Sequence, residues 1–103
     1  MKNIMLVCNA GMSTSMLVTK MLKAAESKGI EATIWAVPLS EVDTEINEKD
    51  VNVLLVGPQV SFMLQEYKDK FEPAVKVDAI NMMDYGTMNG EKVLDLALNM
   101  MGE

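Results

Sequence analysis

Arginine and histidine are both absent from this chain of 103 residues, and cysteine occurs only once, at position 8. A chain with one cysteine forms no internal disulfide, and without histidine it lacks a common partner for a thiol in a metal cluster. A single thiol suits a reducing compartment. The sequence therefore predicts a cytosolic protein with no disulfide, no metal site and no cofactor.

Positive charge and long apolar runs are also scarce. Nine lysines stand against fifteen acidic residues, so the net charge is −6, whereas nucleic-acid binding needs a basic surface that neutralises phosphates. No stretch approaches the roughly 20 apolar residues of a membrane span, and the apolar run after Met1-Lys2-Asn3 is too short for a signal peptide. We expect a soluble cytoplasmic protein that binds no nucleic acid and does not insert into a membrane.

The chain has the length of one domain, residues 1–103, and half of its residues are apolar, enough for a single core. Strand and helix patterns alternate four times along it. Apolar runs predict strands over 4–7, 32–37, 51–56 and 75–79. Helical spacing predicts helices over 13–28, 39–46, 60–71 and from Val93 to Met101, with a loop over 81–89.

This alternation predicts an α/β fold, because strands joined by right-handed helical crossovers form a parallel sheet. The first and third strands are the most apolar and should lie in the middle, which gives the strand order 2-1-3-4 of a flavodoxin-like three-layer sandwich. Ligands of such folds bind beyond the carboxyl ends of the strands at the topological switch point, here between strands one and three. Cys8 ends the first strand and Gly57-Pro58-Gln59 ends the third, so topology alone brings both to the predicted site.

The segment after Cys8 is typical of an anion-binding loop. Small residues lead into a helix that opens with the hydroxyls of Ser13, Thr14 and Ser15, and Gly11 lets the backbone turn with its amides facing inward. The unpaired amides of a first helical turn stabilise a thiolate or a phosphate. The arrangement predicts a cysteine that accepts a phosphoryl group, against the plainer interpretations of a buried small side chain and of hydroxyls that only cap the helix.

A cysteine phosphatase would carry an arginine six residues after its cysteine, and this chain has Thr14 there. The guanidinium fork binds phosphate oxygens bidentately and stabilises their charge during transfer to water. Without it, hydrolysis should be slow, and a phosphocysteine can wait for a designated acceptor. The favoured function is thus a phosphoryl carrier; the alternatives are a small cysteine phosphatase and a non-catalytic regulatory binding domain.

Two segments resemble a known family: Cys8-Asn9-Ala10-Gly11-Met12-Ser13-Thr14-Ser15 and Gly57-Pro58-Gln59-Val60. They are similar to the signatures of the IIB component of the lactose/cellobiose/chitobiose-type sugar phosphotransferase system, and the likeness covers essentially the whole chain. It implies a phosphotransferase in which Cys8 takes phosphate from a phosphohistidine of the partner protein IIA. The phosphate then passes to a disaccharide bound by the membrane permease IIC. The chain is expected to be a monomer that reaches the membrane only through the permease.

The same resemblance implies roles for further residues. Backbone amides from Asn9 to Ser15 (residues Asn9, Ala10, Gly11, Met12, Ser13, Thr14 and Ser15) would form the phosphate loop. The phosphate loop would be bordered by Gly57, Pro58, Gln59, Asp84 and Tyr85.

The roles of several side chains stay open at this point. Asp84 is a turn residue or a general acid, and Tyr85 either contacts a partner or packs. Met12 offers an adaptable apolar contact for docking if it is exposed. We expect Lys20 and Lys23 to face solvent. Five methionines are expected on inward faces: Met16, Met21, Met63, Met100 and Met101.

Overall fold

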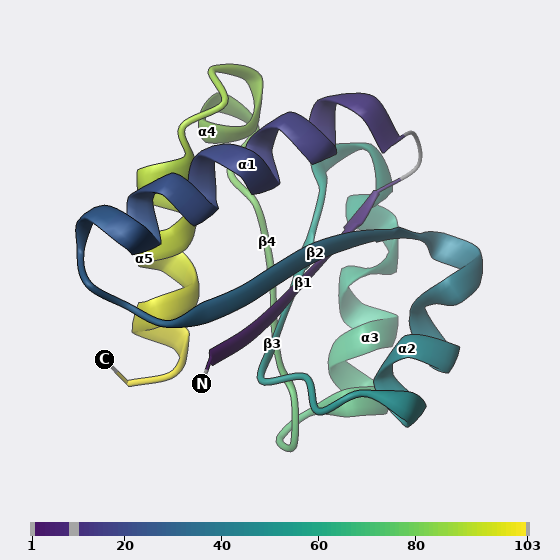
Figure 1. Cartoon of the computed structure of the whole chain (residues 1–103). Helices are drawn as coiled ribbons and strands as arrows, with labels where there is room; N and C mark the ends of the chain where they lie inside the picture. The colour runs from purple at the N-terminus through teal and green to yellow at the C-terminus, as the bar shows by residue number, and fades with distance from the viewer. Residues whose placement is uncertain (1, 9–10, 103) are drawn as a thin grey trace.

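The computed structural model describes residues 2–8 and 11–102, with side chains over 2–8 and 14–102. The strands are β1 (Lys2–Cys8), β2 (Ala32–Pro38), β3 (Val53–Val56) and β4 (Lys76–Ala79). The helices are α1 (Gly11–Ser27), α2 (Val42–Glu48), α3 (Leu64–Phe71), α4 (Met82–Gly86) and α5 (Gly90–Met100). Two 3-10 turns, η1 (Leu39–Glu41) and η2 (Pro58–Met63), precede α2 and α3 (Figure 1).

The four strands form one parallel sheet in the order β2-β1-β3-β4, which confirms the predicted topology. The central strand β1 pairs on both sides, with Leu6 opposite Ala36 of β2 and Leu55 of β3. Because all strands are parallel, their carboxyl ends lie at one edge of the sheet. The residues that directly follow β3 and β4 therefore lie at the same edge as Cys8, the last residue of β1.

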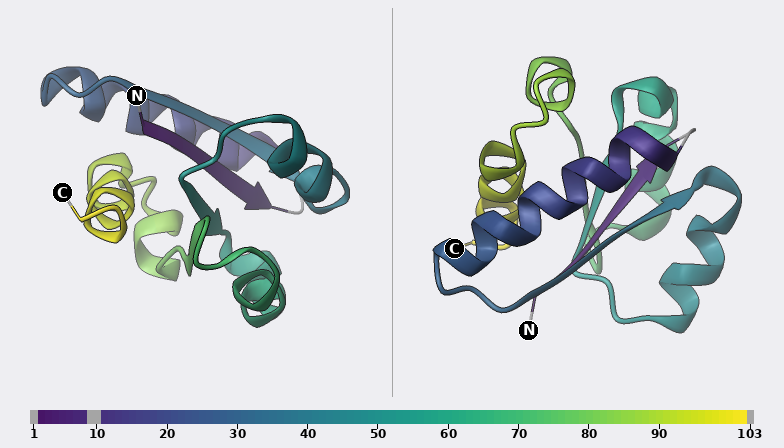
Figure 2. Two further views of the ribbon diagram at one scale, coloured as in Figure 1. Left: turned by 90° about the horizontal axis from the view of Figure 1, so that it is seen from below. Right: turned by 45° about the horizontal axis from the view of Figure 1, so that its top comes forward.

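Helices cover both faces of the sheet, as Figures 1 and 2 show. Alternate residues of β1 point to opposite faces: Ile4 and Leu6 join a core with α1 and α5, and Met5 and Val7 join a core with α2 and α3. An ion pair of 2.8 Å between Lys70 Nζ and Asp43 Oδ1 links α3 to α2. Within the described residues, none of these helices is both long and apolar enough to cross a membrane.

Helix α1 buries a stripe formed by Leu17, Met21 and Ala25, four residues apart as expected for one helical face. Lys20 and Lys23 are exposed, as predicted. Met16 was predicted to face inward, and this is wrong, because 58% of its side chain is exposed. Met16 lies four and seven residues before the two lysines and therefore shares their face rather than that of Leu17. The other four methionines are buried or packed against the two cores.

The prediction of a loop over residues 81–89 is also wrong, since residues 82–86 form helix α4. Asn81 caps it: its side-chain oxygen accepts the backbone N–H of Met83 at 2.8 Å and that of Asp84 at 3.4 Å. A helix this short shows no apolar periodicity, so only the capping residue could have signalled it. The predicted helix over 60–71 begins as the 3-10 turn η2 at Pro58 and becomes α-helical at Leu64.

Candidate functional site

Cys8 is the last residue of β1 and lies at the switch point between β1 and β3. Its side chain is buried, opposite Pro38 of β2 in register. Burial alone would fit a packed small side chain. What distinguishes Cys8 is its place, because it lies at the carboxyl edge of the sheet and only two residues separate it from helix α1.

Gly57 lies directly beside Cys8. Its N–H donates to Val7 O at 2.9 Å, and a Cβ at position 57 would be 3.6 Å from the Cβ of Cys8 and 3.2 Å from Val7 O. The φ of Gly57 is −66°, which any residue adopts, so glycine is favoured here by space and not by backbone conformation. The same hypothetical Cβ would be 3.3 Å from Gln59 Oε1. Residues at the ends of β1 and β3 thus meet, as the topology predicted.

Helix α1 begins at Gly11, so its first turn, which includes Thr14, follows Cys8 closely. The first amides of a helix have no intrahelical acceptors and carry partial positive charge. Ser15 is exposed. Asn9 and Ala10 lie outside the described residues, and for Gly11, Met12 and Ser13 only the helical backbone is described. The predicted docking contact of Met12 therefore lies outside the described side chains.

Thr14 and Tyr85 form a hydrogen bond that joins α1 to α4. The two hydroxyl oxygens are 2.9 Å apart, and the residues are only 1% and 7% exposed. Tyr85 belongs to the core under α1 and α5. Of its two predicted roles, contact with a partner or packing, the structure supports packing. No local pattern in the sequence indicates this bond, because the two residues are 71 positions apart.

Asp84 and Pro58 are half-buried at the same edge. Asp84 lies in the capped first turn of α4, and its carbonyl accepts the N–H of Asn89 at 2.8 Å. Pro58 is the first residue of η2 and directly follows Gly57. The structure therefore brings the residues after β1, β3 and β4 to one edge, as expected for a site bordered by these loops.

Exposed apolar side chains surround this edge, and the sequence analysis missed them. Phe62 of η2 is 73% exposed, and Met82 and Met83 of α4 are each 74% exposed. Met16 lies in the second turn of α1. We call these four residues the apolar rim. Each belongs to an element that follows β1, β3 or β4, so the rim lies at the same edge as Cys8. The adjacent pair Met82-Met83, which begins three residues after the end of a strand, was the available signal.

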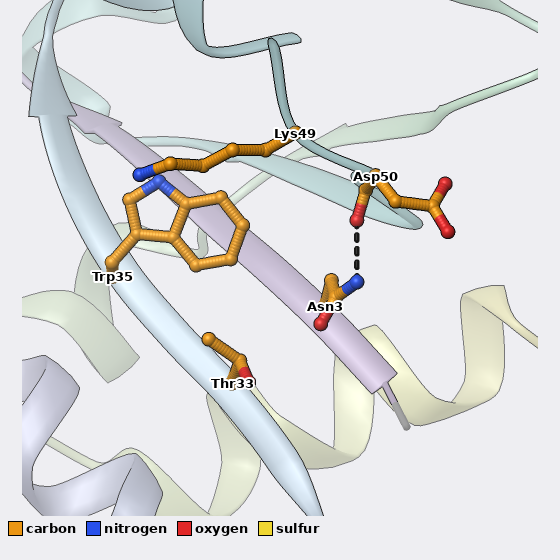
Figure 3. Close-up of a pocket in the computed structure, with 5 residues that line it drawn as sticks. All are labelled: Asn3, Thr33, Trp35, Lys49 and Asp50. Atoms are coloured by element: carbon orange, nitrogen blue, oxygen red, sulfur yellow. Dashed lines mark hydrogen bonds between the residues drawn. The ribbon is translucent and has the colours of Figure 1, made fainter.

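A hollow of about 380 Å³ lies near the amino ends of β1 and β2, away from Cys8 (Figure 3). Asn3 Nδ2 donates to the carbonyl of Asp50 across it. The hollow is lined by Asn3, Thr33, Trp35, Lys49 and Asp50.

The polar groups beside the hollow pair with one another. Trp35 Nε1 donates to Glu45 Oε1 at 3.0 Å, and Lys49 Nζ lies 2.9 Å from the same oxygen. The ammonium of Lys49 also lies 5.3 Å from the centroid of the indole ring. The hydrogen bond from Lys49 and its charge hold the pKa of Glu45 below its ordinary value, with a smaller contribution from the hydrogen bond of Trp35. These contacts tie the end of α2 to β2.

Comparisons with known proteins agree with the fold. Over residues 3–96 the chain matches the family model described as PTS system, Lactose/Cellobiose specific IIB subunit. A cellobiose-specific phosphotransferase IIB component from Borrelia burgdorferi, solved in solution, is 45% identical with a TM-score of 0.76, covering 96% of this chain and 90% of that one. The lactose-specific IIB domain from Streptococcus pneumoniae is 16% identical with a TM-score of 0.81 over 95% of both chains, which supports the fold alone.

Two sequence relatives match over nearly their full length. The oligo-beta-mannoside-specific EIIB component of Bacillus subtilis (strain 168) is 43% identical over 98% of this chain and 97% of its own. The galactose-specific EIIB component of Lactococcus lactis subsp. cremoris (strain MG1363) is 47% identical over 97% of this chain and 96% of its own. The chain therefore belongs to the lactose/cellobiose-specific IIB family of the phosphotransferase system and is a phosphotransferase of sugar transport.

Proposed function

We propose that Cys8 is the residue of this IIB component that carries the phosphoryl group. It receives the group from a phosphohistidine of IIA and passes it to a disaccharide bound by IIC. The observation that carries this proposal is the position of Cys8 at the carboxyl end of β1, beside Gly57 and separated by only two residues from the first turn of α1. The donor histidine belongs to another chain, because this sequence contains none.

The chemistry consists of two displacements at phosphorus. In the first, the thiolate sulfur of Cys8 attacks the phosphorus of the phosphohistidine; the S–P bond forms, the N–P bond breaks, and the imidazole leaves with the electron pair and takes up a proton. In the second, a sugar hydroxyl attacks the same phosphorus, the S–P bond breaks, and the thiolate is restored while the hydroxyl proton leaves. Amides of the phosphate loop, Asn9 to Ser15, stabilise the charge on the phosphoryl oxygens.

The absence of arginine supports a carrier over a phosphatase. No guanidinium is available to stabilise transfer to water, and the exposed Lys20 and Lys23 lie two or more turns into α1. A site built from backbone amides binds the phosphoryl group without supplying this extra cation. The phosphocysteine therefore persists until the sugar-loaded permease docks.

The apolar rim provides the surface for both partners. A phosphoryl group passes directly from one protein to the next, so each partner must cover the edge of the sheet that holds Cys8. Large apolar side chains exposed at such an edge favour a protein partner over bulk water. The chain acts as a monomeric single domain, residues 1–103, that stays in the cytoplasm and reaches the membrane through IIC.

The sugar is a disaccharide of cellobiose, chitobiose or lactose type. The relative named for cellobiose supports this class, whereas the other two are named for galactose, a monosaccharide, and for oligo-beta-mannosides. The sugar pocket belongs to the permease, so the choice among these sugars is made there. Uptake of each labelled disaccharide by cells that express the matching permease would identify it.

Incubation with phosphorylated IIA, followed by intact-mass measurement, tests the assignment. The carrier gains one phosphoryl group, which remains for the length of the incubation and is lost when sugar-loaded permease is added. Rapid release of inorganic phosphate without permease would instead indicate a phosphatase. No gain of mass would leave a non-catalytic regulatory domain and overturn the proposal.

A further inference from the structure

We propose that Tyr85 is a positioning residue for the phosphate loop and acts through its hydrogen bond to Thr14. This inference rests on the proposed role of Cys8. The two hydroxyl oxygens are 2.9 Å apart, and this bond fixes the first turn of α1, whose backbone amides belong to the phosphate loop.

The end of the loop at Cys8 is held by the sheet. Val7, the preceding residue, pairs with β2 on one side and with β3 on the other, and its carbonyl accepts the N–H of Gly57 at 2.9 Å. Strand β1 ends at Cys8. Five residues, 9–13, then separate Cys8 from Thr14. The loop is thus a short segment between two anchors, of which only the first belongs to the sheet.

The second anchor depends on a residue whose backbone is itself fixed. The N–H of Tyr85 donates to Asn81 O at 2.9 Å, and its carbonyl accepts the N–H of Met88 at 3.1 Å. Asn81 also caps α4 through its side chain, and the Tyr85 ring packs in the core that α1 and α5 form with the sheet. A phenol held on this support can fix the Thr14 hydroxyl in one place.

Burial makes the contact specific. Thr14 is 1% exposed and Tyr85 is 7% exposed, so water is a poor substitute partner for either hydroxyl. A different rotamer of Thr14 would break this bond and take away the hydrogen-bond partner of the buried Tyr85 hydroxyl. The first turn of α1 therefore has a strong preference for a single position relative to α4.

A fixed first turn matters for phosphoryl transfer because the amides of that turn are the groups that meet the phosphoryl oxygens. Stabilisation by preorganised donors depends on their placement, and a misplacement of about 1 Å can cost about a hundredfold in rate. Tyr85 does not need to touch the phosphoryl group to have this effect. It acts by keeping the loop in the conformation that receives the group.

The decisive variant is Tyr85→Phe, which removes the hydroxyl and keeps the ring. With phosphorylated IIA as donor, we expect the rate constant of transfer at saturating donor to fall about tenfold. The donor concentration at half-maximal rate should stay unchanged, because the apolar rim is intact. The matched control is Tyr67→Phe, which removes the same atom from a tyrosine buried against the other face of the sheet and should leave the transfer rate unchanged.

Two further variants separate positioning from stability. Thr14→Ser keeps the hydroxyl and should lose less of the transfer rate than Tyr85→Phe does. The double variant Thr14→Val with Tyr85→Phe removes both hydroxyls, so no unpaired polar group remains buried and the free energy of unfolding should return towards that of the wild type. Its transfer rate should remain low. If the rate recovers together with stability, the bond serves only to stabilise the fold, and the inference is overturned.

A phosphate-independent measurement distinguishes this inference from the proposed function. The alkylation rate of Cys8 by iodoacetamide at neutral pH depends on the environment of the thiol whether or not IIA is its donor. If wild type gains no phosphoryl group, the proposed carrier function is wrong. The alkylation rate of Cys8 then tests the positioning role of Tyr85 by itself. A changed rate in Tyr85→Phe, with Tyr67→Phe equal to wild type, supports it; equal rates in all three proteins overturn it. If Tyr85→Phe does not fold, the same comparison is made with the double variant.

Discussion

Gly90, the first residue of α5, packs directly on the backbone of Lys20 in α1. A Cβ at position 90 would lie 2.5 Å from the carbonyl carbon of Lys20 and 2.6 Å from the amide nitrogen of Met21. We expect Gly90→Ala to lower the free energy of unfolding by about 1–3 kcal/mol, the usual cost of overpacking. Urea denaturation followed by circular dichroism measures this.

Gly86→Ala is the matched control for that prediction. Gly86 ends helix α4, and a Cβ there would have no heavy atom within 4 Å. Alanine favours a helix more than glycine does, by up to about 1 kcal/mol, so this variant should be neutral or slightly more stable. Equal effects of the two substitutions would mean that α1 and α5 do not approach as closely as described.

Cys8→Ser should fold normally and accept no phosphoryl group from IIA. A serine hydroxyl is a far weaker nucleophile than a thiolate, and without histidine the chain offers no imidazole to activate it. Intact mass after incubation with phosphorylated IIA gives the result, with Lys20→Ala as the control that should be labelled like wild type. Labelling of the serine variant at a near-normal rate would remove Cys8 from the mechanism.

Gly57→Ala should slow phosphoryl transfer with little loss of stability. The added methyl group would lie 3.2 Å from Val7 O, which must shift by a few tenths of an ångström, and in ordinary contact with the Cβ of Cys8 at 3.6 Å. The site depends on placement more strongly than the fold does. Single-turnover transfer from IIA, compared with the midpoint of urea denaturation, separates the two effects. A rate equal to that of wild type would show that the space beside Cys8 is not needed.

The apolar rim should determine affinity for IIA. Phe62→Ser, or the double variant Met82→Ser with Met83→Ser, should raise the donor concentration at half-maximal rate about tenfold, which corresponds to about 1.4 kcal/mol of binding free energy. The maximal rate should change little. Leu22→Ser is the control, because Leu22 is an exposed apolar residue that lies about 16 Å along α1 from its first residue. If Leu22→Ser weakens transfer as much, the rim has no special part in docking.

From the raised pKa of Tyr67 we expect the protein to lose stability at alkaline pH. Burial raises the pKa of the Tyr67 phenol, and the carboxylates of Asp43 and Glu66 raise it further. In the unfolded chain the phenol ionises near its ordinary value of about 10, while the folded chain retains the proton. The contribution of Tyr67 to stability is therefore complete below about pH 10 and is lost as pH rises through the folded value.

Comparison with Tyr67→Phe isolates this effect, because lysines titrate in both proteins alike. Between about pH 10 and 11 the urea midpoint of wild type should fall more steeply than that of the variant. Parallel curves would show that the Tyr67 phenol ionises equally in the folded and unfolded chains.

The sheet order could be predicted from the sequence because burial determines it. A strand that is apolar throughout, such as residues 53–56, belongs inside the sheet, whereas alternating Lys76, Val77 and Asp78 belong at its edge. The meeting of Cys8 with Gly57 then follows from topology alone. Helix α4 did not follow in this way, because five residues are too few to show a helical period and its start depends on the single side chain of Asn81.

The details of the candidate site were harder to predict. Counting residues equates Thr14 with the arginine of a cysteine phosphatase, but the structure buries Thr14 and pairs its hydroxyl with Tyr85. Contacts between residues far apart in the chain depend on how the helices pack, and a single sequence carries no direct signal of them. Met16 was misassigned for a related reason: its chemical type indicates the core, while the face of the helix on which it lies determines its exposure.

The contacts of Glu45 and Lys49 with Trp35 make the fluorescence of this indole a reporter of unfolding. Trp35 is the only tryptophan, and it lies opposite Met5 in the sheet, on the face turned away from that of Ile4 and Leu6. Cys8 is three residues further along β1, about 10 Å of strand. Indole fluorescence should therefore change when the whole fold melts and stay constant when the thiol is modified. A fluorescence measurement on the unlabelled protein can then show whether an inactive variant is unfolded or folded.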